Sequence, residues 1–432
     1  MNSKRIDEEF DMLLLKKAHI IEPFSDTDET TDILIEDKKI KKISKNITKD
    51  CRTIDCQDKV IVPGLMDMHT HLREPGYEYK ETVATGAEAA MAGGFTAIAC
   101  MPNTNPVLDS RGHIEFIKKQ AQRFLVDVYP IGAVTKGSAG EELTEMEDMI
   151  NAGAIGFSDD GRPIEKASIL RSSLEYSKFL NTRIIDHCED LNLSGEGVMN
   201  EGYYSTLLGL NPIPSLSEDI MVMRDVLIAE FTRTPIHIAH VSTKGSVKII
   251  EDAKNRGVPV TAETCPHYLI LTDKDLTTYD TNKKMKPPLR TEEDQEAVID
   301  GLKRGVIDVI ASDHAPHHFD EKDVEFDLAA FGIIGLETIV GLILTHFVDK
   351  EIFSLKDFIE KMSVRPREIL NLPLIKIEEN SPANLTILDL NKKWKVDKNL
   401  FKSKSRNTPF HGWELKGKSS GVINNGKIYL NQ

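Results

Sequence analysis

The sequence has no uninterrupted apolar run long enough to cross a membrane, and its N-terminus, MNSKRIDEEF, lacks the apolar core of a signal peptide. Positively charged residues are also few relative to negatively charged ones. The chain has 54 lysines and arginines and 69 aspartates and glutamates, which gives a formal net charge of −15. This field repels nucleic acid and anionic membranes, so we expect neither as a partner. An anionic substrate would need a local group of cations. We expect a cytoplasmic protein.

Cysteine is sparse as well. The five cysteines are scattered and odd in number, which argues for reduced thiols and against a disulfide framework. Cys51 and Cys56 lack the close pairing of a zinc knuckle, and no second pair follows, so we interpret them as packing residues. The composition is ordinary for a soluble globular protein, and 432 residues fit one large domain with an accessory layer.

Short β-branched runs alternate with helical stretches, such as SEDIMVMRDVLIAEF, from about residue 60 onward. Eight strands with intervening helices over roughly 300 residues predict an α/β fold, a (β/α)₈ TIM-like barrel, rather than an open sheet. The strand candidates are residues 60–68, 95–101, 126–134, 154–157, 183–187, 235–240, 258–263 and 306–312.

The two chain ends differ from the middle, because residues 12–48 and 384–430 contain alternating strands. Turns are predicted at Glu36-Asp37 and Asn425-Gly426. We expect both ends to pair into one small, discontinuous β-sandwich beside the barrel. The expected division is 1–64 for its N-terminal part, 65–369 for the metal-dependent barrel and 370–432 for its C-terminal part.

Most of the strand candidates end in residues that can bind a metal or a proton. In a (β/α)₈ barrel the carboxyl ends of all strands meet on one face, so residues far apart in sequence come together. These residues are His69 and His71, Asp159 and Asp160, His187, His240, and the group Asp313, His314, His317 and His318.

Each of these signals has an ordinary structural interpretation when taken alone. A single His-x-His motif often arises by chance, and one histidine such as His187 or His240 is more typical of a hydrogen-bonded core residue. Asp159-Asp160-Gly161 alone is typical of a turn. Turn and core residues have no reason to follow successive strands, however, so the whole set favours a metal site.

The donor types indicate which metal to expect. Imidazole and carboxylate ligands without thiolate favour zinc, with manganese or cobalt as alternatives in vitro. Four histidines and two carboxylates exceed the need of one tetrahedral ion and suit two ions that share a bridging carboxylate. Water bound to such ions is a nucleophile at neutral pH, because coordination lowers its pKa.

Ten motifs, from HTHLREPG (69–76) through FSDDG (157–161) and SDHAPH (312–317) to NTPFHGWELKG (407–417), run along nearly the whole chain. Together they resemble those of dihydroorotases, specifically the bacterial type I branch of the amidohydrolase superfamily. The resemblance implies zinc-dependent interconversion of N-carbamoyl-L-aspartate and L-dihydroorotate in pyrimidine (UMP) biosynthesis. It also allows a homodimer and an association with aspartate transcarbamoylase. The motifs are HTHLREPG (69–76), MPNT (101–104), FSDDG (157–161), DHCED (186–190), AHVST (239–243), TAETCPH (261–267), PPLR (287–290), SDHAPH (312–317), FGIIGLET (331–338) and NTPFHGWELKG (407–417).

The resemblance implies metal ligands at named positions. His69, His71 and Asp313 would hold one ion, and His187 and His240 the other. Asp160 would bridge both, with Asp159 as the weaker alternative. Many relatives use a carboxylated lysine as the bridge, but no lysine lies between Lys136 and Lys166. Asp313 would also take a proton during attack on the ring amide and return it to the leaving nitrogen.

The resemblance also implies substrate contacts, of which Arg73 suits a carboxylate because its planar fork donates two parallel hydrogen bonds. Pairing of Arg73 with Glu74 and a turn role for Asn103 are the structural alternatives. His314 and His318 are more typical of loop or supporting residues. The implied substrate-binding residues are Arg73, Asn103, Lys286, His317, Phe331 and Gly332.

Two positions depart from the family pattern. Lys286 stands before PPLR where asparagine is usual, and Ala330 stands before Phe331 where proline is usual. A lysine cannot copy the donor-plus-acceptor pattern of an amide, so we expect Lys286 either to contact the anionic substrate or to point to solvent. The Ala330 change affects backbone stiffness more than chemistry.

Two rival functions remain. An allantoinase or hydantoinase uses the same hydrolytic chemistry on an uncharged ring, but a neutral ring offers a buried Arg73 nothing to pair with. A non-catalytic, dihydroorotase-like subunit would be expected to have lost metal ligands, whereas every ligand position is filled here. Metal analysis and substrate assays distinguish a dihydroorotase from these two rival functions.

Overall fold

The computed structural model describes residues 7–25 and 27–431. The first six residues of the N-terminal stretch, which we interpreted as lacking a targeting segment, lie outside this described part. No helix in it is both long enough and apolar enough to span a bilayer. All five cysteines are free thiols, as the sequence predicted.

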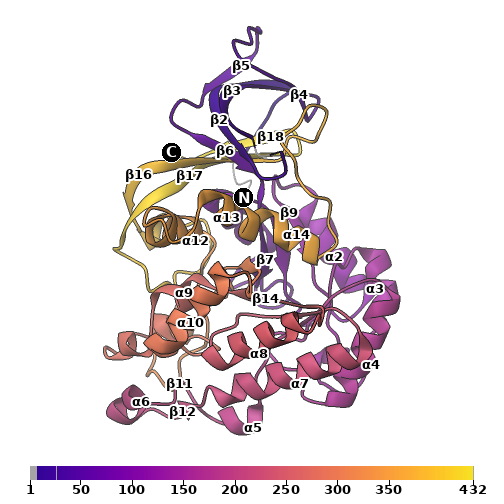
Figure 1. Cartoon of the computed structure of the whole chain (residues 1–432), viewed down its shortest axis with the longest axis vertical. Helices are drawn as coiled ribbons and strands as arrows, with labels where there is room; N and C mark the ends of the chain where they lie inside the picture. Colours follow the sequence, from indigo (N-terminus) through magenta and orange to yellow (C-terminus); the bar gives the residue numbers. More distant parts are fainter. Residues whose placement is uncertain (1–6, 26, 432) are drawn as a thin grey trace.

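Strands from both chain ends form one nine-stranded sheet (Figure 1), as predicted. Antiparallel pairs β6–β16 and β1–β18 join the two ends. The strands are β1 (Glu8–Glu9), β2 (Met12–Glu22), β3 (Thr27–Glu36), β4 (Lys39–Ser44), β5 (Arg52–Asp55), β6 (Val60–Pro63), β16 (Leu385–Lys395), β17 (Glu414–Asn424) and β18 (Lys427–Leu430).

The predicted turns in this sheet are correct at one place and one residue out at the other. Asn425 and Gly426 have φ values of 54° and 75° and join β17 to β18. In the N-terminal hairpin the left-handed residues are Asp37 and Lys38, at 51° and 64°, so the turn begins one residue later than predicted. Two positive φ angles in succession match the twist of a two-residue hairpin.

Parallel strands form the second structural unit. Each residue of β7 and β8 is buried, as expected for strands covered on both faces. The order β7-β8-β9 makes one sheet and β10-β13-β14-β15 another, with a separate β11-β12 pair. The bounds are β7 (Leu65–Thr70), β8 (Phe95–Cys100), β9 (Asp127–Pro130), β10 (Ile184–Asp186), β11 (Met199–Asn200), β12 (Pro212–Ile213), β13 (Ile236–Ile238), β14 (Val260–Thr264) and β15 (Val309–Ile310).

Single parallel bridges connect the two parallel sheets at both edges. Phe157 bridges Gly132 after β9 and Ile184 of β10, and His314 after β15 bridges Thr70 of β7. The strand predicted at 154–157 therefore forms bridges through Phe157, and Ile155 N–H also donates to Pro130 O of β9. These bridges place the carboxyl ends of distant strands side by side.

Helices surround the parallel strands and pack on them through apolar faces. The α-helices are α1 (Val83–Gly93), α2 (Arg111–Ala121), α3 (Met146–Ala152), α4 (Ala167–Phe179), α5 (Leu191–Ser194), α6 (Tyr203–Leu208), α7 (Leu216–Thr232), α8 (Lys244–Asn255), α9 (Pro266–Ile270), α10 (Glu292–Lys303), α11 (Phe319–Lys322), α12 (Ile339–Ile343), α13 (Leu355–Ile359) and α14 (Arg365–Ile369). Shorter turns are η1 (Lys136–Ser138), η2 (Asp273–Leu276), η3 (Thr281–Lys283), η4 (Leu344–Val348), η5 (Glu360–Val364) and η6 (Lys398–Leu400).

The prediction of a single strand over residues 60–68 is wrong. Residues 60–63 form β6 in the nine-stranded sheet, and residues 65–70 form β7 among the parallel strands. Gly64 separates them in a crowded place, since a Cβ there would lie 1.7 Å from Asn384 Oδ1 and 2.3 Å from Thr96 Oγ1. A continuous apolar run does not reveal such a change of sheet.

We predict that Gly64→Ala destabilises the fold by about 1–3 kcal/mol, because the added methyl group must displace buried neighbours. Gly112→Ala in α2 is the matched control, since a Cβ there meets no atom within 4 Å. The control should change stability by at most about 1 kcal/mol. Urea unfolding followed by circular dichroism measures both, and equal midpoints for Gly64→Ala and wild type would contradict the account.

Candidate metal centre

The Asp160 carboxylate lies among four histidines. Its Oδ2 atom is 3.6 Å from Nε2 of both His69 and His71. Its Oδ1 atom is 3.6 Å from His187 Nδ1 and 3.4 Å from His240 Nε2. Each oxygen thus faces one pair of imidazoles, and the carboxylate is shared by two groups of possible metal ligands, one of His69, His71 and Asp160 and the other of Asp160, His187 and His240.

Asp313 adds a second carboxylate on one side of the cluster. Its Oδ1 atom is 3.0 Å from His71 Nε2 and 3.6 Å from His69 Nε2. The backbone of Asp313 has a φ of 45°, and that of His240 has a φ of 33°. Left-handed backbone in residues other than glycine is strained and concentrates at functional sites, where it serves to aim a side chain.

The far nitrogen of three imidazoles is held by an acceptor outside the cluster. Glu263 on β14 accepts from His69 Nδ1, Asn103 Oδ1 accepts from His71 Nδ1 at 2.8 Å, and Glu189 accepts from His187 Nε2 at 3.2 Å. When a metal ion is bound, these acceptors would keep the proton on the far nitrogen and leave the lone pair of the other nitrogen for the ion.

The donor set fits bound metal ions. His69 Nε2 and Asp160 Oδ1 are buried and have no hydrogen-bond partner, although buried polar atoms almost always find one. Two ligands at about 2.1 Å from a tetrahedral ion lie about 3.4 Å apart, which matches the spacing from the Asp160 oxygens to the imidazole nitrogens. Imidazole and carboxylate donors without thiolate suit zinc and similar ions.

Both carboxylates are ionised at neutral pH. Burial alone would raise the pKa of Asp160, but His69, His187 and His240 hold it well below its usual range. Burial acts in the same way on Asp313, whose pKa is nevertheless lowered to about 2 by the hydrogen bond from His71 and the nearby His69. Asp313 is therefore free to accept a proton.

Arg73 is buried, with Nε donating to Pro316 O at 3.2 Å and Nη2 lying 3.4 Å from His317 Nε2. Within residues 7–25 and 27–431 no carboxylate is within ion-pair distance of it, and Glu74 instead caps α1 at Val83 N. A buried guanidinium without an acidic partner can receive an anionic ligand.

Lys286 faces the site. Its ammonium is 3.0 Å from Glu189 Oε1 and 5.3 Å from the centre of the Phe331 ring. Phe331 O accepts a hydrogen bond of 2.7 Å from His317 Nε2, and Gly332 N–H donates to Lys284 O. Phe331 therefore lies between Lys286, near its ring, and His317, bonded to its carbonyl.

Three other candidates lie outside the cluster. Asp159 turns away and accepts hydrogen bonds from the backbone of Val134 and Thr135. His314 contacts Glu81, and its Nδ1 accepts from Gly335 N–H. His318 is exposed and caps α11.

Two buried lysines fasten the segment that carries Phe331 and Gly332. Lys322 Nζ donates to the carbonyl oxygens of Lys284, Ala330 and Gly332. Lys284 Nζ donates to those of Phe326 and Asp327. Burial, with Lys284 nearby, lowers the pKa of Lys322 to about 7, and burial, with Lys286 nearby, lowers that of Lys284 to about 8. The segment 323–332 is thus anchored through its main chain.

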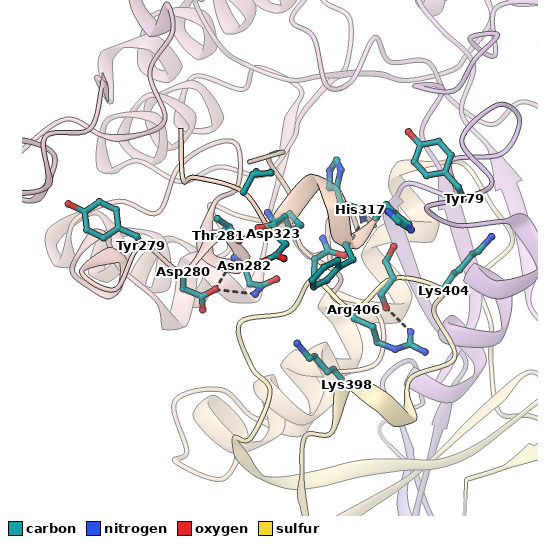
Figure 2. Close-up of a pocket in the computed structure, with 16 residues that line it drawn as sticks. Tyr79, Tyr279, Asp280, Thr281, Asn282, His317, Asp323, Lys398, Lys404 and Arg406 are labelled. Atoms are coloured by element: carbon teal, nitrogen blue, oxygen red, sulfur yellow. Dashed lines mark hydrogen bonds between the residues drawn. The ribbon is translucent and has the colours of Figure 1, made fainter. Parts of the chain in front are cut away.

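A pocket of 510 Å³ opens beside His317, between the segment 316–324 and the C-terminal segment 398–407 (Figure 2). Lys398, Lys404 and Arg406 line it on the C-terminal side, and Asp280 and Asp323 lie on the other side. It provides part of the local positive charge that the acidic chain lacks elsewhere.

Several residues of the site were not predicted from the sequence. Glu263 contacts both His69 and His237, and Glu189 links His187 to Lys286. His267 is buried with an unpartnered Nε2, and burial lowers its pKa to about 4. Glu189, Glu263 and His267 all lie in motifs quoted above, and Glu263 also ends the strand candidate 258–263, a signal that could have indicated it.

Known proteins resemble this chain over almost its full length. A family model described as "Dihydro-orotase-like" matches residues 58–246. The dihydroorotase of Acetivibrio thermocellus is 49% identical over 422 residues, which cover 97% of this chain and 99% of that protein. The dihydroorotase of Syntrophus aciditrophicus is 50% identical over 420 residues, covering 96% and 98%.

Solved structures agree with this assignment. The L-hydantoinase (dihydropyrimidinase) of Arthrobacter aurescens superposes with a TM-score of 0.85 at 26% identity, covering 96% of this chain and 95% of that one. The resemblance found in the sequence motifs is therefore confirmed, and the chain is a cyclic amide hydrolase of the α/β class. It belongs to the dihydroorotase family.

Proposed function

We propose that this chain hydrolyses L-dihydroorotate to N-carbamoyl-L-aspartate and catalyses the reverse ring closure, as a step of pyrimidine biosynthesis. The observation that carries the proposal is a histidine cluster around Asp160 with an unpaired, buried Arg73 beside it. The cluster supplies hydrolytic chemistry, and Arg73 supplies the partner for a substrate carboxylate. Relatives named dihydroorotase at about half identity support the same substrate.

Two zinc ions per subunit fit this site. His69, His71 and Asp313 would hold one, His187 and His240 the other, and Asp160 both. When bound, such ions polarise an amide carbonyl and lower the pKa of water. Glu263, Asn103 and Glu189 keep the imidazoles in the required tautomer.

Asp313 would move the proton in the reaction. One oxygen lies against His71, and the carboxylate is ionised, so Asp313 can accept a proton from the attacking water. Ring opening then requires a proton on the amide nitrogen that leaves, and the protonated Asp313 supplies it. In the direction of ring closure the same carboxyl group takes the proton from the attacking nitrogen.

The side chains around Arg73 would fix the ring. Arg73 and His317 lie together next to Asp313, and Asn103 contacts His71. Arg73 would bind the carboxylate of the substrate bidentately, while Asn103, His317 and the backbone of Phe331 and Gly332 contact its remaining polar edges. A hydantoin or allantoin ring has no carboxylate for Arg73, which disfavours those substrates.

The wider organisation is part of the proposal. The bridges Phe157–Ile184 and Thr70–His314 support closure of eight parallel strands into a (β/α)₈ barrel. The change of sheet at Gly64 supports a division into 1–64, 65–369 and 370–432, with a β-sandwich built from both ends. A homodimer and an association with aspartate transcarbamoylase remain predictions.

Ring opening of L-dihydroorotate by the purified, zinc-loaded chain tests the proposal. Asp313→Asn should reduce turnover by about 10²–10⁴-fold, because the proton shuttle is lost. Asp252→Asn, on the exposed side of α8, should leave turnover unchanged. Zinc content is measured on each protein. Opening of hydantoin or allantoin in place of dihydroorotate would make the chain a hydantoinase-type enzyme, and zinc without any turnover would indicate a non-catalytic subunit.

Lys286 gives a further prediction. If its ammonium serves the anionic substrate, Lys286→Asn should raise KM about tenfold or more, because a charged hydrogen bond contributes roughly 1.5–3 kcal/mol. Lys286→Arg keeps the charge, so its KM should lie between those of wild type and Lys286→Asn. Unchanged kinetics in Lys286→Asn would exclude the contact. Loss of zinc from that variant would show instead that Lys286 acts through Glu189 on His187.

A further inference from the structure

Helix α7 presents an apolar stripe to solvent. Figure 1 shows the helix at the surface beside α4, α5 and α8. Its exposed residues are all apolar, with exposed fractions between 43% and 69%, although exposed helix positions in a monomer are ordinarily polar. They are Leu216, Ile220, Met223, Leu227 and Phe231.

The acidic side chains of α7 are instead engaged by other residues of the chain, either buried or, for Glu230, in an ion pair at the surface. Glu218 is buried and accepts from Ser242 N–H, and Asp225 is buried against Arg224. Glu230 pairs with Arg256 of α8. The polar groups of the helix are thus engaged within the chain, and the apolar line remains for contact with something outside it.

The spacing of the stripe is that of a helix–helix seam. Steps of four, three, four and four residues keep the side chains on one face, as in the a and d positions of a coiled coil. The stripe is also symmetric about its middle. An antiparallel contact around a two-fold axis between Met223 and Arg224 sets Leu216 against Phe231 of a second copy and Ile220 against Leu227, so one surface complements itself.

Exposed apolar residues of neighbouring helices extend the stripe at both of its ends. Lys178 Nζ donates to Thr232 O at 2.8 Å, which places Phe179, 85% exposed at the end of α4, beside the Phe231 end. Asp190 N–H donates to Ser217 O at 2.8 Å, which places the half-exposed Leu191 and Leu193 of α5 at the other end. An antiparallel contact brings these apolar ends together.

The charged residues near the two ends of α7 also favour an antiparallel contact. The Phe231 end carries the exposed Lys178 and Arg233, and Arg171 lies 5.1 Å from the Phe231 ring. The Leu216 end carries the exposed Glu196 and the half-buried Asp190. Two copies in antiparallel contact therefore set a basic end against an acidic end, which favours this orientation over the parallel one.

We propose that α7 is the dimer interface of this protein, formed with α7 of a second copy in antiparallel contact. The proposal concerns assembly and does not depend on the proposed activity. The active residues lie at the strand ends, so substitutions on the outer face of α7 leave them in place.

Sedimentation velocity over a range of concentrations tests the interface. Wild type should sediment as a species of twice 48.4 kDa. Leu227→Glu should raise the dimer dissociation constant by about 100-fold or more, because a buried charge would lack a partner. Leu400→Glu, at an apolar residue 76% exposed on another surface, is the matched control and should stay dimeric.

Cysteine cross-linking tests the orientation. Under oxidation Met223→Cys should link to itself, and Leu216→Cys should link to Phe231→Cys when the two are mixed. Wild type is the control, since four of the five native cysteines are buried. A monomeric wild type, a dimer unaffected by Leu227→Glu, or self-linking of Leu216→Cys would overturn the proposal. Assembly with a different protein alone would do so as well.

Discussion

A main-chain contact between the first and the last parallel strand holds the two sides of the metal centre together. His71 N–H donates to His314 O at 2.8 Å, and Thr70 bridges His314 in parallel. This contact puts the His-x-His pair of one strand within reach of the aspartate of the other. A change of register by one residue would turn both histidines away, because side chains alternate along a strand.

The arrangement also explains how so many ionisable side chains can be buried at the metal centre. Asp160, Asp313 and Glu263 are almost fully inaccessible, which without compensation would cost several kcal/mol per charge. Each carboxylate lies against imidazoles, and each outer acceptor fixes the tautomer of the ring that it contacts. The network is interdependent, so its members stabilise one another and the loss of one leaves others unpaired.

The sequence predicted the parallel strands and the residues at their ends well, because a buried parallel strand gives a continuous apolar run and a polar residue after it is conspicuous. It did not predict the break at Gly64, since the apolar run continues through the change of sheet. Nor did it indicate Glu263, although this residue ends the strand candidate 258–263, because its role is to contact His69 and His237 and not to face Asp160. The exposed apolar face of α7 was not predicted either. Helical periodicity in a sequence shows that an apolar stripe exists, but it does not show whether that stripe faces the core or the solvent.

The anchoring of the segment 323–332 has a consequence for how its sequence can change. Lys322 and Lys284 donate hydrogen bonds to carbonyl oxygens, which every amino acid provides. The position of the segment therefore does not depend on these bonds being made to particular side chains. Ala330 illustrates this, because its carbonyl accepts from Lys322 at 2.7 Å just as that of a proline could. The segment is therefore free to diverge in sequence while Phe331 and Gly332 keep their place, which makes it a natural point for altering substrate preference without rebuilding the fold.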